Sequence, residues 1–110
     1  MKRQIKGEAL SAYIPPTVTP LGSYPVLDKS ALLRGFLDDK GSALSVVVYF
    51  EWGTSTGYGS ATDQQTLAKD NNVFSAWVTP LKGNTTYHFR VVAVGDGITY
   101  SNDETFRTLP

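Results

Sequence analysis

The stretch from Leu81 to Val94 constrains the fold most strongly, and it reads LKGNTTYHFRVVAV. A polar turn is followed by residues whose side chains are expected to alternate between the two faces of a strand. The odd-numbered residues from Tyr87 to Ala93 are predicted on one face, and the even-numbered residues from His88 to Val94 on the other. A turn followed by a Tyr at the start of a long strand is typical of the tyrosine corner of β-sandwiches. We therefore expect the Tyr87 hydroxyl to bond backbone within residues 81–84.

Shorter strands are expected between turn signals on both sides of this segment. Residues 21–29 and most of 60–72 are predicted to be loops, because Gly, Pro and polar residues dominate them. Together with the strand above, the predicted strands number about seven, at the spacing of a sandwich. The other predicted ranges are 17–19, 30–38, 45–52, 65–69, 73–79 and 98–108, the last reached through a hairpin turn at 95–97.

Two charged side chains set the predicted strand faces. Arg34 and Glu51 should face water, which sends their neighbours at odd spacing inward. Trp77 then faces outward, because Ala76 and Val78 take the inner face of the same strand. The predicted core consists of Leu33, Leu37, Val46, Val48, Phe50, Trp52, Phe74, Ala76, Val78, Leu81, Phe89, Val91 and Phe106.

Composition excludes several classes of function. The 110 residues suffice for one domain. Ten basic and ten acidic residues cancel, so nucleic acid and anionic membrane are not expected partners. No run of about 20 apolar residues predicts membrane insertion. Gly7 and Glu8 interrupt the basic start before any apolar run, so no signal peptide is predicted in this chain.

Residues suited to catalysis or metal binding are sparse. The chain has no Cys and a single His, His88, which is predicted mid-strand and outward. Neither an activated nucleophile nor a zinc ligand set can be assembled from them. Asp38, Asp39 and Asp96 stand in predicted turns, where they could meet calcium, but such acids more often serve the turn backbone. The sequence therefore predicts a protein that is not an enzyme and has no cofactor.

Four motifs in order resemble fibronectin type III modules of bacterial surface, secreted or phage proteins. Residues 81–87 are similar to the signature Leu-x-Pro-x-Thr-x-Tyr, with Gly83 where Pro is usual. Residues 49–59, YFEWGTSTGYG, resemble the Phe-Glu-Tyr-Gly-Thr pattern of the bacterial modules, while 31–35 and 104–108 fit their second and last strands. The resemblance implies a seven-stranded immunoglobulin-like β-sandwich over 15–110. It also implies a structural tyrosine corner formed by Leu81, Gly83, Thr85 and Tyr87.

One departure from that pattern concerns the core. Animal modules carry a Trp on the second strand near the position of Gly35, so here we expect the aromatic bulk to come from Phe50 and Trp52. Outward aromatics are the features that could bind a ligand, and the candidate surface comprises Trp77, Arg34, Tyr58 and Tyr49. The alternative favoured for Trp77 is that Arg34 covers its ring. Tyr49, Glu51, His88 and Arg90 should share the outer face of the other sheet, either as a contact surface or as an ion-pair ladder.

The resemblance implies a non-catalytic spacer module of a larger extracellular or cell-surface protein. Its expected partners are neighbouring domains of the same polypeptide, with residues 1–14 a linker or the tail of a preceding module. Pro15-Pro16 and Leu109-Pro110 favour stiff joints. The alternative is an adhesion module that binds polysaccharide or protein through exposed aromatics.

Overall fold

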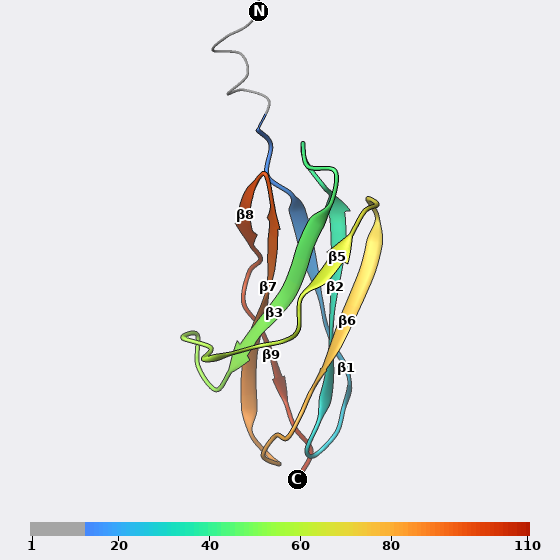
Figure 1. Ribbon diagram of the computed structural model, residues 1–110. Helices are drawn as coiled ribbons and strands as arrows, with labels where there is room; N and C mark the ends of the chain where they lie inside the picture. Colours follow the sequence, from blue (N-terminus) through green and yellow to red (C-terminus); the bar gives the residue numbers. More distant parts are fainter. Residues whose placement is uncertain (1–12) are drawn as a thin grey trace, which may run out of the picture.

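The computed structural model describes residues 13–110, which form two β-sheets packed face to face (Figure 1). The expectations for residues 1–14 therefore fall almost wholly outside the described residues. The strands are β1 (Thr17–Val26), β2 (Ala31–Asp39), β3 (Val46–Gly53), β4 (Ser60–Ala61), β5 (Gln65–Leu67), β6 (Asn72–Val78), β7 (Thr86–Gly95), β8 (Gly97–Tyr100) and β9 (Glu104–Arg107).

The strand order is β1-β2-β6 in one sheet and β4-β3-β7-β8 in the other, and all pairings are antiparallel. β4 and β5 both pair with β3, and β8 and β9 both pair with β7. β4 and β5 are therefore two parts of one interrupted strand, and so are β8 and β9. Counted in this way, the nine labelled segments make seven strands. The all-β, seven-stranded sandwich expected from the sequence is confirmed.

The last strand is interrupted because a side chain replaces the backbone in its ladder. The Ser101 N–H donates to the Val91 carbonyl at 2.9 Å, and the Val91 N–H donates to the Ser101 hydroxyl at 2.8 Å. With the hydroxyl as acceptor, the chain leaves the ladder over residues 101–103 before β9 resumes it. The continuous strand predicted over 98–108 is wrong at this point.

The first strand is much longer than expected. Residues 21–26 were predicted to be loop, but they continue β1 along β2 as an edge strand with register shifts. An edge position tolerates Pro20 and Pro25, because their missing N–H groups are not needed by a neighbour on the outer side. Gly22, at φ +83°, and the Ser23 hydroxyl, which donates to the Leu32 carbonyl at 3.0 Å, accommodate one of these shifts.

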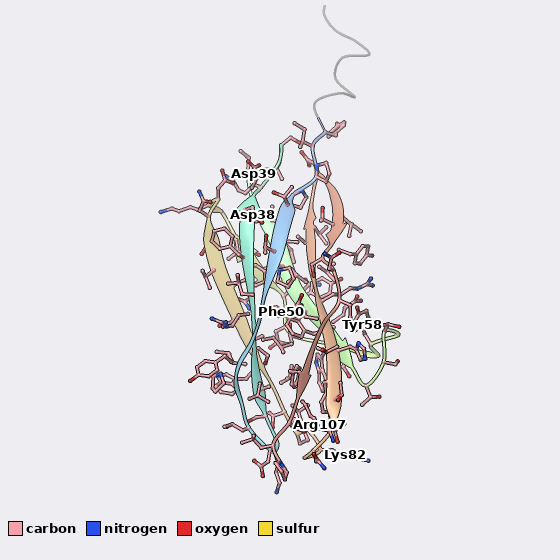
Figure 2. All side chains as sticks on the ribbon, turned by 180° about the vertical axis from the view of Figure 1, so that it is seen from behind. Asp38, Asp39, Phe50, Tyr58, Lys82 and Arg107 are labelled. Atoms are coloured by element: carbon pink, nitrogen blue, oxygen red, sulfur yellow. The ribbon has the colours of Figure 1, made fainter. Side chains whose placement is uncertain are left out.

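The core lies between the sheets around Phe50, labelled in Figure 2. Eleven of the thirteen predicted core residues are buried, while Trp52 and Ala76 are half-buried and pack against the cluster. Val92 is 1% exposed although its side chain belongs to the outer face. Its cross-strand neighbours there are Tyr49 on β3 and Tyr100 on β8, and their rings are large enough to shield it.

The space above Gly35 is filled from β6 rather than from Trp52. A Cβ on Gly35 would lie 2.7 Å from two ring atoms of Phe74, and the Phe74 ring stands 5.4 Å from that of Phe50. Trp52 lies instead beside Tyr87, with ring centroids 6.0 Å apart. The expectation was correct for Phe50 and wrong for Trp52, because the second ring is that of Phe74 on β6, the direct cross-strand neighbour of Gly35.

The Tyr87 phenol is buried, and its hydroxyl oxygen accepts the Lys82 backbone N–H at 2.9 Å. The bond falls within the 81–84 segment named from the sequence. Leu81 is buried beneath the same turn, Gly83 is exposed, and the Thr85 hydroxyl donates to the Gly83 carbonyl at 2.9 Å. This geometry joins the turn before β7 to the strand itself.

Removing the Tyr87 hydroxyl should weaken the corner without emptying the core. Tyr87→Phe keeps the ring and leaves the Lys82 N–H without its acceptor, so we expect a loss of about 1–2 kcal/mol in the free energy of unfolding. Urea denaturation measures this loss. Tyr24→Phe, at an exposed tyrosine, is the control and should change little. Equal effects of the two substitutions would contradict a structural role for the corner.

Candidate functional site

Arg34 and Trp77 do not form the expected pair. Cross-strand partners are Arg34 with Ser75 and Leu32 with Trp77, so the two side chains are diagonal neighbours on the outer face. The Arg34 guanidinium instead turns toward β1 and donates to the Leu21 carbonyl at 3.1 Å. Within residues 13–110 the cations that stack on aromatic rings all belong to Arg90. Trp77 is therefore left 53% exposed and uncovered by Arg34.

A cluster on the outer face of β3, β7 and β8 is built around Arg90. Its Nε donates to the Glu51 carboxylate at 2.7 Å across the strand pair. Its guanidinium carbon lies 4.8 Å from the centre of the Tyr58 ring and 4.2 Å from that of Tyr100. Paired with a carboxylate and placed against two rings, this cation is held in one position. We call Glu51, Tyr58, His88, Arg90, Tyr100 and Asp103 the Arg90 cluster.

Asp103 connects the rest of the cluster. One carboxylate oxygen accepts the Tyr58 hydroxyl at 2.9 Å, and the other lies 2.8 Å from Nδ1 of His88. Tyr58 is on the loop that projects from the side of the sandwich (Figure 2), and its backbone has φ +57°, an unusual value outside glycine. The loop is thus fastened to the sheet through the phenol. His88 and Arg90 share the outer face as predicted.

Burial is the main cause that raises the pKa of two phenols on this face. The pKa of Tyr58 rises from 10.0 to about 12, first through loss of hydration and then through the hydrogen bond and negative charge of Asp103. The pKa of Tyr49 is raised too, through burial first and the Glu51 charge second. Both phenols therefore stay neutral across the physiological range.

The Tyr58 shift predicts a loss of stability in strong base. Because the folded pKa lies above the unfolded value, the contribution is full below pH 10.0 and is lost as the pH rises through about 12. Spectrophotometric titration of the phenolates should show that Tyr58→Phe removes one late-titrating group. A Tyr58→Phe difference curve centred at the ordinary tyrosine value would contradict the contact with Asp103.

A groove of about 410 Å³ opens at the edge between the two sheets, where the segment leading from β4 to β5 faces the end of β6. Both tryptophans of the chain line it. We call it the tryptophan groove, and its lining residues are Trp52, Ala61, Thr62, Asp63, Gln65, Ala76, Trp77, Val78 and Thr79. A second hollow of about 390 Å³ lies between the Tyr58 loop and the Glu51–Arg90 pair.

The three acids that were predicted in turns make backbone and hydroxyl contacts, but Asp38 and Asp39 lie at the end of β2 rather than in the turn that follows it. Asp39 accepts the Gly41 N–H at 2.6 Å, and Asp38 accepts the Thr19 hydroxyl at 2.7 Å. Asp96 accepts the Ser42 hydroxyl at 2.7 Å. Among residues 13–110 no group of three or more His, Cys, Asp or Glu side chains is arranged to hold a metal ion. The same part of the chain contains no helix long and apolar enough to cross a membrane.

No protein-family model and no curated protein matches this sequence. Among solved structures, the sensor domain of the anti-sigma factor RsgI4 from Pseudobacteroides cellulosolvens superposes with a TM-score of 0.71 at 18% identity, over 86% of this chain and 95% of that one. A multidomain fragment of titin gives 0.59 at 22% identity, over 88% of this chain and 32% of the fragment. The chain has a fibronectin type III-like fold.

Sequence analysis correctly predicted some of the residues that form the candidate surfaces on this fibronectin type III-like fold. Tyr49 on β3 and the ring of Tyr58 from its loop both lie near the Glu51–Arg90 pair. The sequence predicted that Tyr49, Glu51 and Arg90 share this outer face. Tyr100 and Asp103 were missed. The hairpin at 95–97 could have revealed Tyr100, because counting back from the turn pairs it with Val92. No comparable signal places Asp103, which follows the interruption after β8.

Proposed function

We propose that this domain is a non-catalytic spacer module of a larger extracellular or cell-surface protein, with neighbouring domains of the same polypeptide as its partners. The observation that carries the proposal is that the described chain is fixed to the sandwich at both of its ends. The first described segment, drawn in blue, lies at one end of the sandwich, and the C-terminus lies at the opposite end (Figure 1). A module that holds its neighbours apart needs both features.

At the first end, the chain is clamped before β1 begins. The Ile14 N–H donates to the Ser42 hydroxyl at 2.8 Å, and the Ser42 N–H donates back to the Ile14 carbonyl at 3.0 Å. Gly41 leaves room for this approach, because a Cβ there would overlap the Ile14 carbonyl oxygen. Pro16 follows and is fully buried. The joint is therefore part of the sandwich rather than a free linker.

At the opposite end, the chain is clamped after β9. The Leu109 N–H donates to the Leu27 carbonyl at 3.1 Å, while the Leu109 carbonyl accepts the Asn84 N–H at 2.8 Å. Thr108 is buried, and its hydroxyl accepts the Thr85 N–H at 2.9 Å. These bonds tie the last residues both to the corner before β7 and to the turn after β1. Force or torque applied at Pro110 would thus be passed to the whole domain.

Two further points support a role without turnover. In the Arg90 cluster, Glu51 pairs with Arg90 and Asp103 pairs with His88. Asp38, Asp39 and Asp96 accept hydrogen bonds from nearby hydroxyl and backbone groups. The chain also resembles bacterial fibronectin type III modules, which recur in tandem in surface and secreted proteins. Its fold is shared with a sensor domain, which is likewise one part of a larger protein.

NMR relaxation of the whole chain tests the rigid ends. The Ile14 and Leu109 amides should have order parameters near those of the strands, about 0.85. Ser42→Ala should lower the Ile14 value, because it removes the hydroxyl acceptor. Ser45→Ala, at a nearby exposed serine, should leave it unchanged. Values below about 0.6 at both amides in the unaltered chain would overturn the spacer proposal.

A second function, binding through exposed aromatics, is supported by the position of Trp77. It is half exposed, Arg34 does not cover it, and it lines a groove with the other tryptophan. A spacer can also carry such a site, because the groove lies on the side of the sandwich and not at a joint.

A further inference from the structure

We propose that the tryptophan groove is a binding site for a neutral saccharide. The groove opens where the edge of one sheet diverges from the edge of the other, with Trp52 at the end of β3 and Trp77 near the end of β6. Its volume of about 410 Å³ falls within the range of small-ligand sites, roughly 300–1,000 Å³. The spacer role and this site are independent, because the clamped ends lie outside the groove.

The two indoles supply the apolar surface. Trp52 is half-buried and packs against the core, with its ring 6.0 Å from that of Tyr87, so its orientation is fixed. Trp77 is 53% exposed, and among residues 13–110 no cation or second ring stacks on it. A pyranose has a face of C–H groups that packs on an indole ring. Ala76 and Val78 continue the apolar lining between the tryptophans.

The rim supplies hydrogen-bonding groups for sugar hydroxyls. Gln65 donates its amide to the Ser75 carbonyl at 2.9 Å, which leaves the amide oxygen as an acceptor. Thr62 accepts the Phe50 N–H at 2.9 Å, and its own hydroxyl hydrogen can still donate. The Asp63 carboxylate makes no hydrogen bond or ion pair with any other described residue. A purely apolar ligand would leave these groups desolvated and unpaired.

The charge of the groove further restricts the class of ligand that it can bind. Among residues 13–110, Asp63 is the one ionisable residue that lines the groove, and none of the lining residues is Lys or Arg. A phosphorylated or uronic-acid ligand would therefore bring a negative charge beside a carboxylate. A neutral sugar meets no such penalty and can donate its hydroxyls to Asp63 and Gln65. The combination of two indoles, polar acceptors and a lone acid thus matches a neutral saccharide.

The chain's two tryptophans make the test direct, because only two indole N–H signals appear in an NMR spectrum. Maltohexaose, cellohexaose and mannohexaose would be titrated separately into the whole protein. We expect at least one to shift both indole signals saturably, while an oligogalacturonate does not. Trp77→Ala should weaken binding by about tenfold or more, as loss of a central aromatic contact does. Asp63→Asn should weaken it less while preserving the shape of the groove.

Tyr100→Ala is the matched control, since Tyr100 is 52% exposed, belongs to the Arg90 cluster and does not line the groove. It should leave saccharide binding unchanged. Binding that is lost in Tyr100→Ala but kept in Trp77→Ala would overturn the proposal. So would the absence of saturable shifts with every neutral hexasaccharide. Tetramethylammonium and an extended apolar peptide would be titrated as further probes. Saturable shifts of the indole signals with either of these, and not with a neutral saccharide, would also refute the saccharide site.

Discussion

Phe50→Ala should destabilise the domain by about 3–5 kcal/mol, a large share of the roughly 5–15 kcal/mol that holds a typical domain folded. Phe50 has no exposed surface. Its ring lies 5.4 Å from that of Phe74 on the opposite sheet and 6.0 Å from that of Phe89 on its own sheet. Truncation removes these contacts and leaves a cavity between the sheets that backbone cannot close.

Chemical denaturation would measure this loss as a lower midpoint with an unchanged slope. Leu44→Ala is the control, because it also removes a large apolar side chain but at a position that is 91% exposed. We expect its effect to stay within about 0.5 kcal/mol. If the two variants unfold at the same denaturant concentration, the sandwich does not have its core at Phe50.

Gly53→Ala should release the loop over residues 54–59 and lower the free energy of unfolding by about 3 kcal/mol, the upper end of the usual cost of overpacking. A Cβ at Gly53 would overlap the backbone carbonyl of Tyr58, so the loop could not keep its present path. Tyr58 would then leave the Arg90 guanidinium and lose its hydrogen bond to Asp103. The pKa of its phenol should fall from about 12 back toward its ordinary value.

Gly57→Ala provides a matched control in the same loop. A Cβ there would meet nothing closer than the Ser55 hydroxyl at 3.5 Å, an ordinary contact. Its effect should remain within about 0.5 kcal/mol, with the Tyr58 titration unchanged. Unchanged titration in Gly53→Ala as well would mean that the loop does not need this close approach to hold Tyr58.

The inner faces of the central strands were predictable because side-chain direction in a strand is a local property. Alternation alone sends Val46, Val48 and Phe50 to one side of β3, whichever strand lies beside it. A polar residue such as Glu51 fixes which side is inner. The same reasoning placed Arg90 and Glu51 on one outer face, and the 2.7 Å pair between them follows from the antiparallel register.

The tyrosine corner was equally accessible, because the turn at 81–86 and the ring of Tyr87 lie within a few residues of each other. A contact of such short range depends little on the rest of the fold. The hydrogen bond from the Lys82 N–H to the Tyr87 phenol oxygen could therefore be predicted from one continuous segment of the sequence.

What only the tertiary structure decided is the set of contacts that depend on how distant strands slide past one another. The Arg34 side chain could have contacted either of two neighbours on the outer face. The register of β1 brings the Leu21 carbonyl within hydrogen-bond distance, so the guanidinium binds this carbonyl and not the Trp77 ring. Ser101 replaced a backbone acceptor only because it stands beside Val91. Trp52 is on the inner face of its sheet, and Trp77 is on the outer face of the other sheet. The two tryptophans line one groove only because the edges of the two sheets diverge there. Each of these outcomes requires the relative position of segments far apart in the chain, which periodicity does not encode.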